Sequence, residues 1–379
     1  MSIMDRLKKS SKIKDIATLN KSIMYSNKTV TSTAVPMINV ALSGELEGGL
    51  TSGLLVLAGP SKHFKTSFAL LMAAAYMKKH PDALLLFYDS EFGSPEAYFE
   101  SYGIDTSQVL HTPIMNIEEL KFDIVAQLEE LQRTDNVIII IDSIGNLASK
   151  KELDDAVNEN SAADMSRAKA LKGLFRMVTP YLTMKDIPMI AINHTYQTME
   201  KFSKAVVSGG TGIQYSADNI WIIGRQQDKI GREIQGYHFI VNIEKSRFVK
   251  EKSRIPISVT FDGGIMRYSG LLEVACAGGF VAKPTKGFYQ VVDRETGELV
   301  GKKFREKETN TEDFWGQFIN DNEAFKDFIK HQYTLGFKAM IEDFELGVLD
   351  EGEDAMKKVY AADAKKAKQN EDEDQDEDY

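Results

Sequence analysis

Residues 54–67 constrain the fold more than any other stretch of this 379-residue chain. A short apolar run leads into a turn opened by Gly59, and a second apolar run follows. Gly59, Lys65 and Thr66 match the pattern G-x-x-x-x-G-K-[ST], in which backbone N–H groups and a helix N-terminus surround a phosphate. Phe64 stands where the pattern has its second glycine. The stretch predicts strand, loop and helix, and favours nucleotide binding over a plain strand-turn-helix. The candidate binding residues are Gly59, Pro60, Ser61, Lys62, His63, Phe64, Lys65, Thr66 and Ser67.

Length and composition indicate a chain with a large core and two or three domains. Hydrophobic residues make up 43% of the sequence, which suits a large α/β domain with smaller additions. No apolar run approaches the roughly 18 residues that a membrane helix needs. The charged N-terminus precedes no apolar signal-peptide core, so we expect a cytoplasmic protein without membrane contact. Cys276, the single cysteine, cannot form an intrachain disulfide and is expected to pack in the core.

The net charge of −10 does not exclude a nucleic-acid partner, because the negative charge is concentrated at one end. Residues 371–378 hold seven acidic side chains, which leaves a net charge of −3 on the rest of the chain. The charge balance of the main body therefore says little about its partners.

Three further apolar runs predict buried parallel strands beside the phosphate-binding loop. These runs are residues 84–88, 137–141 and 187–193. They are short and apolar, as strands are when helices cover both faces of a sheet. The runs 219–223, 237–243 and 255–261 follow without helices between them, so antiparallel strands are expected at one edge. The predicted fold is α/β with a mostly parallel central sheet.

Capping residues and apolar spacing predict the helices between these strands. Ser94-Pro95-Glu96 carries an N-cap residue and a proline at the first helical position. Residues 117–131 place apolar side chains on one face. Ser161 and Asp164 form a capping-box pattern before a long helix that should end near Leu182.

The two ends of the chain differ from the α/β core. Residues 1–35 predict short amphipathic helices in an arm too small to bury its own apolar face, so the arm must pack on the core or on another subunit. After about residue 270, a helix over 271–277, a hairpin over 288–300 and helices over 311–335 predict a small α+β domain. The predicted divisions are the arm (1–35), the core (36–270), the C-terminal domain (271–350), and a lysine-bearing helix with an acidic tail (351–379).

Polar residues follow the predicted parallel strands, where ligands bind in sheets of this kind. They are Glu91, Asp142 and Asn193-His194, in addition to the phosphate-binding loop. Asp142 has the form of a carboxylate that orients magnesium while Thr66 coordinates the ion, or it caps a helix. Glu91 is then free to accept a proton from an attacking water, or it is a surface residue in a turn. His194 is a candidate donor to a terminal phosphate, or it is simply packed or solvated.

In their order and spacing, these motifs resemble the RecA-type homologous recombinases. The matching residues are 59–66, Tyr88-Asp89-Ser90-Glu91, Ile140-Ile141-Asp142-Ser143, Ile192-Asn193-His194 and Glu244-Lys245-Ser246-Arg247. The resemblance runs from about residue 36 to residue 335 and is strongest to the bacteriophage branch, which also has phenylalanine at the position of Phe64. It implies a RecA-like P-loop ATPase core.

The resemblance also implies a site for ATP and Mg²⁺. Lys65 and Thr66 would hold phosphates and metal, Asp142 would be the Walker B acid that shares the metal, and Glu91 the general base. His194 stands where the bacterial proteins have a glutamine that couples the γ-phosphate to DNA binding. Phe64 removes a glycine, so the loop backbone is expected to adopt a conformation open to a residue with a Cβ.

Four more residues acquire roles from the resemblance. Tyr98 is similar to the family's adenine-stacking tyrosine, and Tyr268 is a candidate for the other face of the base. Lys245 and Arg247 resemble a basic pair that reaches the ATP site of a neighbouring subunit. Spacing alone would make them a solvated strand end.

Two polar segments resemble the DNA-binding loops of the family. Their candidate residues are Lys150 and Lys151 in 146–160, and Tyr196, Lys201, Phe202, Lys204, Gly209 and Gly210 in 196–212. Cations for phosphates, aromatic rings for bases and a glycine-rich helix start suit sequence-tolerant binding of single strands. Without the resemblance, both segments would be ordinary flexible loops.

The function implied is that of an ATP-dependent recombinase, acting in phage recombination, repair and recombination-dependent replication in the cytoplasm of an infected bacterium. It would form helical filaments on single-stranded DNA and pair that strand with homologous double-stranded DNA. Further partners would be a single-strand DNA-binding protein and a recombination mediator. The alternatives are a hexameric helicase motor on the same core, or a nucleotide-binding regulator without catalysis.

Overall fold

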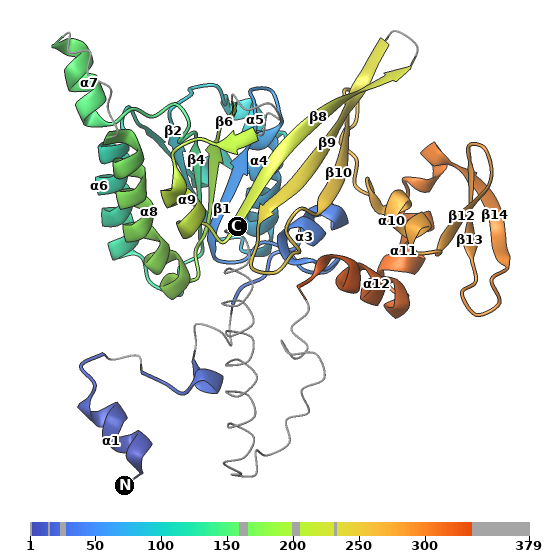
Figure 1. The fold of residues 1–379 in the computed structure, drawn as a ribbon, viewed down its shortest axis with the longest axis horizontal. Helices are drawn as coiled ribbons and strands as arrows, with labels where there is room; N and C mark the ends of the chain where they lie inside the picture. The colour runs from blue at the N-terminus through green and yellow to red at the C-terminus, as the bar shows by residue number, and fades with distance from the viewer. Residues whose placement is uncertain are drawn as a thin grey trace, which may run out of the picture. The chain divides into compact units, whose positions relative to one another are not determined.

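The computed structural model describes residues 2–13, 16–22, 28–158, 166–198, 205–230 and 233–335 (Figure 1). The chain divides into two units, Met1–Leu335 and Gly336–Tyr379, and the second lies wholly outside the described residues. The helix and acidic tail predicted for 351–379 therefore remain predictions.

A nine-stranded sheet organises the first unit, in the order β11-β10-β9-β8-β1-β5-β4-β2-β3. Its strands are β1 (Gly53–Ala58), β2 (Leu84–Asp89), β3 (Val109–Pro113), β4 (Val137–Asp142), β5 (Pro188–Asn193), β8 (Asn219–Ile230), β9 (Glu233–Lys245), β10 (Arg254–Thr260) and β11 (Gly264–Ile265). The strands from β8 to β3 pair in parallel, and β9, β10 and β11 add antiparallel pairs. The mostly parallel sheet with one antiparallel edge is thus confirmed. The edge strand β3 was not predicted.

Alternate side chains along β1 face two different helical layers. Leu55 and Leu57 join the cluster that contains α3 (Pro36–Ser43) and α4 (Lys65–Lys79). Leu54 and Val56 join the cluster that contains α6 (Ile117–Glu130), α8 (Ser166–Lys185) and α9 (Thr211–Ser216). Helices therefore cover both faces of the parallel part of the sheet, which is why its strands are apolar on both sides.

Residues 271–335, drawn in orange to red in Figure 1, form the helix, hairpin and helices that the sequence predicts. The elements are α10 (Leu271–Ala277), β12 (Val281–Thr285), β13 (Phe288–Val292), β14 (Leu299–Arg305), η3 (Glu306–Thr309), α11 (Glu312–Ile319) and α12 (Glu323–Tyr333). Strand β12 was not predicted. Phe280 and Trp315 belong to the same hydrophobic cluster as Leu55 of the central sheet. This region therefore has no core separate from that of the central sheet, and the predicted domain boundaries stay predictions.

The shorter elements correct several expectations. They are α1 (Ile3–Ser10), η1 (Leu19–Lys21), α5 (Glu96–Glu100), η2 (Thr106–Gln108), α7 (Lys150–Val157), β6 (Thr195–Gln197) and β7 (Ala205–Val207). Helix α1 confirms a helix in the arm. Helix α5 has Pro95 as its N-cap, one residue later than expected. Helix α7 forms within a predicted loop, because Ser149 and Glu152 complete a capping box there. The capping pattern predicted at Ser161 lies outside the described residues.

Candidate nucleotide-binding site and basic groove

The loop between β1 and α4 lines a pocket of about 230 Å³. Residues 61–67 contribute to the lining, together with Glu91, Tyr98, Asp142 and His194. Gly59 begins the loop, and a Cβ there would lie 2.9 Å from the carbonyl oxygen of Ile223. Glycine is therefore required at this position by close packing against β8. The structure brings together the strand ends that the sequence predicts to meet.

Phe64 holds the position of the missing glycine in a left-handed conformation. Its φ is 58° and its ψ is 20°, immediately before the first residue of α4. A side chain with a Cβ pays roughly 1–2 kcal/mol in this region. The ring offsets this cost by packing 5.1 Å from the ring of Phe239 and 6.3 Å from that of Phe68, centroid to centroid. The loop therefore keeps a glycine-like geometry, in a left-handed conformation that a residue with a Cβ can adopt at this cost.

Arg225 of β8 holds the other left-handed residue of the loop. Lys62 has a φ of 61°, and its carbonyl oxygen accepts a hydrogen bond of 2.9 Å from Nη1 of Arg225. The guanidinium lies 4.7 Å from the centre of the Tyr237 ring on β9. The β8–β9 hairpin thus supports the loop at two points. The sequence gives no sign of this, because the two segments are far apart along the chain.

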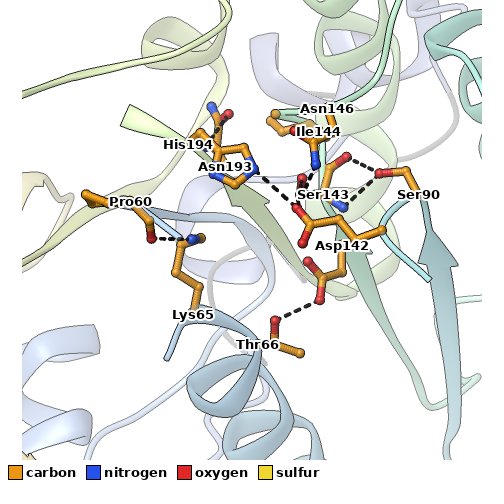
Figure 2. A network of polar contacts seen from close by, with 12 residues as sticks. Pro60, Lys65, Thr66, Ser90, Asp142, Ser143, Ile144, Asn146, Asn193 and His194 are labelled. Atoms are coloured by element: carbon orange, nitrogen blue, oxygen red, sulfur yellow. Dashed lines mark hydrogen bonds and ion pairs between the residues drawn. The ribbon is translucent and has the colours of Figure 1, made fainter. Parts of the chain in front are cut away.

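Lys65 is buried at the start of α4, with 7% of its surface exposed. Its Nζ donates to the carbonyl oxygen of Pro60 at 2.9 Å (Figure 2). Burial lowers the pKa of this ammonium group, and the nearby Glu91 and Asp142 carboxylates oppose that shift. A buried cation at a helix N-terminus suits binding of a phosphate.

Thr66 and Asp142 lie face to face beside the loop. The Thr66 hydroxyl donates to Oδ2 of Asp142 at 2.8 Å (Figure 2). Asp142 is 4% exposed, and burial raises its pKa to about 6, with Glu91 and Asp89 adding to the shift and the Thr66 bond opposing it. Its Oδ1 is buried without a hydrogen-bond partner. A hydroxyl and a carboxylate with a spare oxygen fit Mg²⁺, which takes few protein ligands beside phosphate and water oxygens. Nothing in the described part of the chain gathers three or more potential metal ligands of the His, Cys, Asp or Glu type.

Glu91 is held by donors from two neighbouring strand ends. Its Oε1 accepts hydrogen bonds from Ser143 Oγ at 2.7 Å, Asn146 Nδ2 at 3.1 Å and His194 Nε2 at 3.2 Å. The His194 bond, with help from Ser143 and against burial, lowers the pKa of Glu91 to about 2. Glu91 is therefore an ionised carboxylate fixed at the pocket rim.

His194 and Asn193 join this pocket to the β6–β7 segment. Asn193 Nδ2 donates to the carbonyl oxygen of Ser208 at 2.8 Å, and the Ser208 N–H donates to the carbonyl oxygen of His194 at 3.0 Å. Strand β6 begins directly after His194, and strand β7 ends directly before Ser208. The two strands pair with each other in antiparallel register. The backbone of His194 is thus hydrogen-bonded directly to the end of this segment.

The two predicted base-contacting tyrosines lie in different places. Tyr98 lines the pocket, and its hydroxyl meets Ser67 Oγ on α4. Tyr268 is 7% exposed, and its ring stacks on Trp315 at 6.5 Å, outside the pocket lining. The structure therefore gives Tyr268 a packing role and does not bring it to the pocket.

Lys245 and Arg247 also lie outside the pocket of their own subunit. Lys245 Nζ donates to the carbonyl oxygen of Gln214 on α9 at 2.6 Å, and Arg247 forms an ion pair with Asp218. The side chain of Arg247 is 66% exposed. The role that the resemblance implies for this pair at a neighbouring subunit stays a prediction.

The predicted DNA-binding residues are only partly described. Lys150 and Lys151 lie in the first turn of α7, where Lys151 pairs with Asp155 at 3.7 Å. Tyr196 is 56% exposed on β6, and Gly209 and Gly210 lead into α9 with positive φ. Lys201, Phe202 and Lys204 lie outside the described residues.

A second cavity, of about 510 Å³, lies between α6 and α8, and we call it the basic groove. Its cations are Lys121, Lys169, Lys172 and Arg176. Three of them are spaced three and four residues apart on α8, so they share one helix face. These cations were not predicted from the sequence. Their spacing of three and four residues, soon after a predicted DNA-binding loop, could have indicated a shared basic helix face.

Arg167, at the start of α8, ties the predicted DNA-binding segments together. Its guanidinium donates to the carbonyl oxygens of Leu147 and of the neighbouring Gly145, each at 2.8 Å. A further N–H points to Ser208 Oγ at 3.4 Å. Burial lowers its pKa. This residue was also not predicted.

A P-loop on a mostly parallel sheet, with carboxylates at the neighbouring strand ends, defines the class of P-loop nucleotide-binding proteins. Comparison with known proteins agrees with this class. The RecA N-terminal domain family matches residues 2–268. The family described as the C-terminal domain of the bacteriophage T4 recombination and repair protein matches residues 268–329. The chain belongs to the RecA family and is a homologous recombinase of that family.

Individual relatives place it within the family. The "Recombination and repair protein" of Enterobacteria phage T4 is 53% identical over 335 residues, covering 87% of this chain and 85% of the relative. "Protein RecA" of Tropheryma whipplei is 25% identical over 315 residues, covering 80% of this chain and 67% of the relative. "Protein RecA" of Borreliella afzelii is 22% identical over 265 residues, covering 66% of this chain and 68% of the relative. The predicted resemblance and fold class are thus confirmed. Among the described helices, none combines the length and apolar character that crossing a membrane requires.

Proposed function

We propose that this recombinase binds ATP with Mg²⁺, forms helical filaments on single-stranded DNA, and pairs the bound strand with a homologous duplex while it hydrolyses ATP. The observation that carries the proposal is the 3.2 Å hydrogen bond between His194 and Glu91. It joins the carboxylate at the pocket rim to the residue from which the β6–β7 segment starts. A nucleotide and a DNA strand can therefore act on the same pair of side chains.

The pocket holds the groups that a triphosphate needs. Lys65 would bind the outer phosphates, and the loop N–H groups would surround them. Thr66 and Asp142 would hold Mg²⁺, which neutralises charge that develops on the phosphates during transfer. Tyr98 would stack on the adenine ring.

Glu91 would accept the proton of the attacking water, but a carboxylate with a pKa of about 2 is a weak base. The largest cause of that low pKa is the bond from His194. If His194 donates instead to a γ-phosphate oxygen, Glu91 loses this donor and becomes more basic. The same movement of His194 would displace the β6–β7 segment, because the His194 carbonyl oxygen is hydrogen-bonded to Ser208. Binding of ATP would thus activate the base and change the DNA-binding segment in one step.

The basic groove supports a DNA partner. Three of its cations lie on α8, after residues 146–160, and Arg167 connects this region to Ser208. A track of cations beside an exposed aromatic residue and glycines suits the phosphate backbone of a single strand.

Exposed apolar side chains support assembly with copies of the same chain. Ile3, Met4 and Leu7 of α1 are 69%, 51% and 63% exposed. Edge strand β3 and the following turn expose Leu110 and Met115 at 50% and 71%. An apolar helix face and an open sheet edge are surfaces that a second subunit covers. In such a filament Lys245 and Arg247 would complete the ATP site of the neighbour, after Arg247 leaves Asp218.

Other partners follow from family membership. A single-strand DNA-binding protein and a recombination mediator are proposed as partners, in the cytoplasm of an infected bacterium. Membership of the RecA family favours this function over the helicase and regulator alternatives.

The decisive experiment is strand exchange between a circular single strand and a homologous linear duplex, with ATP and Mg²⁺. We expect joint molecules from the unaltered protein and none from Lys65→Ala. Glu91→Gln should bind single-stranded DNA with ATP but fail to hydrolyse it. Absence of joint molecules from the unaltered protein, with a single-strand DNA-binding protein and a mediator supplied, would contradict the proposal.

A further inference from the structure

Asp89 is a buried carboxylate next to Glu91 that the proposed mechanism does not use. It is the last residue of β2, and its side chain is 4% exposed. Its Oδ1 accepts the backbone N–H of Glu91 at 3.0 Å and that of Phe92 at 2.8 Å. Phe92 has a φ of 53°, so the chain turns sharply here. The Asp89 carboxylate therefore holds the turn from which the side chain of Glu91 extends.

The second oxygen of Asp89 is held by His111. Nε2 of His111 lies 3.2 Å from Oδ2 of Asp89. Nε2 is placed to donate in this contact, because a carboxylate oxygen accepts hydrogen bonds. His111 lies on β3 opposite Phe87 of β2, and the two rings stack at 5.8 Å with an interplanar angle of 28°. This stacking fixes the orientation of the imidazole, and the imidazole fixes the carboxylate.

Glu91 is thus restrained at both ends. Asp89 holds its backbone N–H, while Ser143, Asn146 and His194 hold one carboxylate oxygen at 2.7–3.2 Å. Such bonds weaken steeply when a group moves by even 1 Å. Loss of the backbone restraint would shift the carboxylate relative to the water that it is proposed to activate.

We propose that Asp89 and His111 are positioning residues for Glu91: the histidine on β3 fixes the aspartate, and the aspartate fixes the turn that presents the general base. This inference rests on the proposed role of Glu91 in ATP hydrolysis. It gives the edge strand β3 a part in catalysis without contact with the nucleotide.

The test uses the full-length protein and its ATP hydrolysis with single-stranded DNA. His111→Ala should lower kcat about tenfold, because a misplaced catalytic group loses rate while substrate contacts persist. KM for ATP should change less than about threefold, since the phosphate contacts are intact. His111→Gln offers an amide N–H to Asp89 and should restore kcat to within about threefold of the unaltered protein. His331→Ala, which alters an exposed side chain of α12, is the matched control and should leave kcat unchanged.

A double-variant cycle separates positioning from simple packing. Asp89→Ala should reduce kcat at least as much as His111→Ala, and combining the two should reduce it no further, because both act through one contact. DNA binding supported by a non-hydrolysable ATP analogue should be unchanged in His111→Ala. Loss of that binding, or additive effects in the double variant, would overturn the inference.

Glu91→Gln distinguishes failure of this inference from failure of the proposed function. If Glu91→Gln still hydrolyses ATP, the general-base assignment is wrong. If Glu91→Gln is inactive and His111→Ala turns over normally, the base is correct and the positioning role of His111 is refuted.

Discussion

At the residue scale, the ionised side chain of Asp142 destabilises the folded protein when no divalent cation is bound beside it. Burial raises its pKa from the ordinary value of 3.8 to about 6. Between these two values the folded protein binds a proton that the unfolded chain has released. Stability therefore falls as the pH rises from about 4 to about 6, by at most about 3 kcal/mol, and stays reduced at pH 7.

Asp142→Asn should remove this penalty, because the amide oxygen still accepts the Thr66 hydroxyl but carries no charge. Without divalent cations, the variant should be more stable than the unaltered protein at pH 7, and the difference should vanish near pH 4. Urea unfolding at both pH values measures this effect. Asp262→Asn, on an exposed turn, is the control. Equal stability of the Asp142 variant and the unaltered protein at pH 7 would contradict the raised pKa.

At the element scale, the β8–β9 hairpin maintains a phosphate-binding loop that lacks its second glycine. Arg225→Ala removes the bond to the Lys62 carbonyl and the stacking on Tyr237. KM for ATP should rise about three- to tenfold, or about 0.7–1.4 kcal/mol, which is the net free energy of about one ordinary hydrogen bond. Arg225→Lys should reverse only part of this rise in KM, since an ammonium group lacks the planar stacking surface of a guanidinium group. Isothermal titration with ATP supplies an independent measure.

Gln227→Ala is the matched control on the same strand, because this side chain is exposed. Unchanged ATP affinity in Arg225→Ala would show that the packing of Phe64 on Phe239 suffices to hold the loop.

Helix α8 makes a prediction about salt dependence. If Lys169 and Lys172 each contact a phosphate, alanine at either position should weaken single-strand binding. It should also reduce the slope of log affinity against log salt by about 0.7. Lys78→Ala is the control, because α4 covers the opposite face of the sheet. A uniform loss of affinity with an unchanged slope would argue against phosphate contacts.

Some elements could be predicted from their local sequence, and others could not. Strands β1 and β4 are short apolar runs buried on both faces, so their ends, and with them Asp142, could be placed from the sequence. Strand β3 reads Val-Leu-His-Thr-Pro, with mixed polarity and a proline, which is the composition of an edge strand and gives no periodic signal.

Residues that act through tertiary contacts were not predictable for a different reason. Arg225 and His111 meet the site only because sheet pairing brings distant segments together. The role that the resemblance implies for Tyr268 could not take account of the stacking of its ring on Trp315.

At the scale of the whole molecule, the apolar face of α1 should control assembly. Leu7→Asp places a charge among Ile3 and Met4, where a second subunit is proposed to pack. Filaments on single-stranded DNA should shorten or disappear in electron micrographs, while the isolated protein still binds ATP. Lys9→Asp puts the same charge on the opposite side of the helix and should leave filaments long. Normal filaments from Leu7→Asp would assign assembly to other surfaces.

The hydrophobic cluster that runs from the central sheet to Trp315 also bears on how this gene can change. Two family matches meet at residue 268, so the family boundaries alone would suggest two separable halves joined there. The packing ignores that point, because Tyr268 stacks on Trp315 and both share one cluster with Leu55. A hybrid gene joined there would unite two halves of a core that had not been selected together. The segments on the two sides of residue 268 are therefore expected to be inherited together.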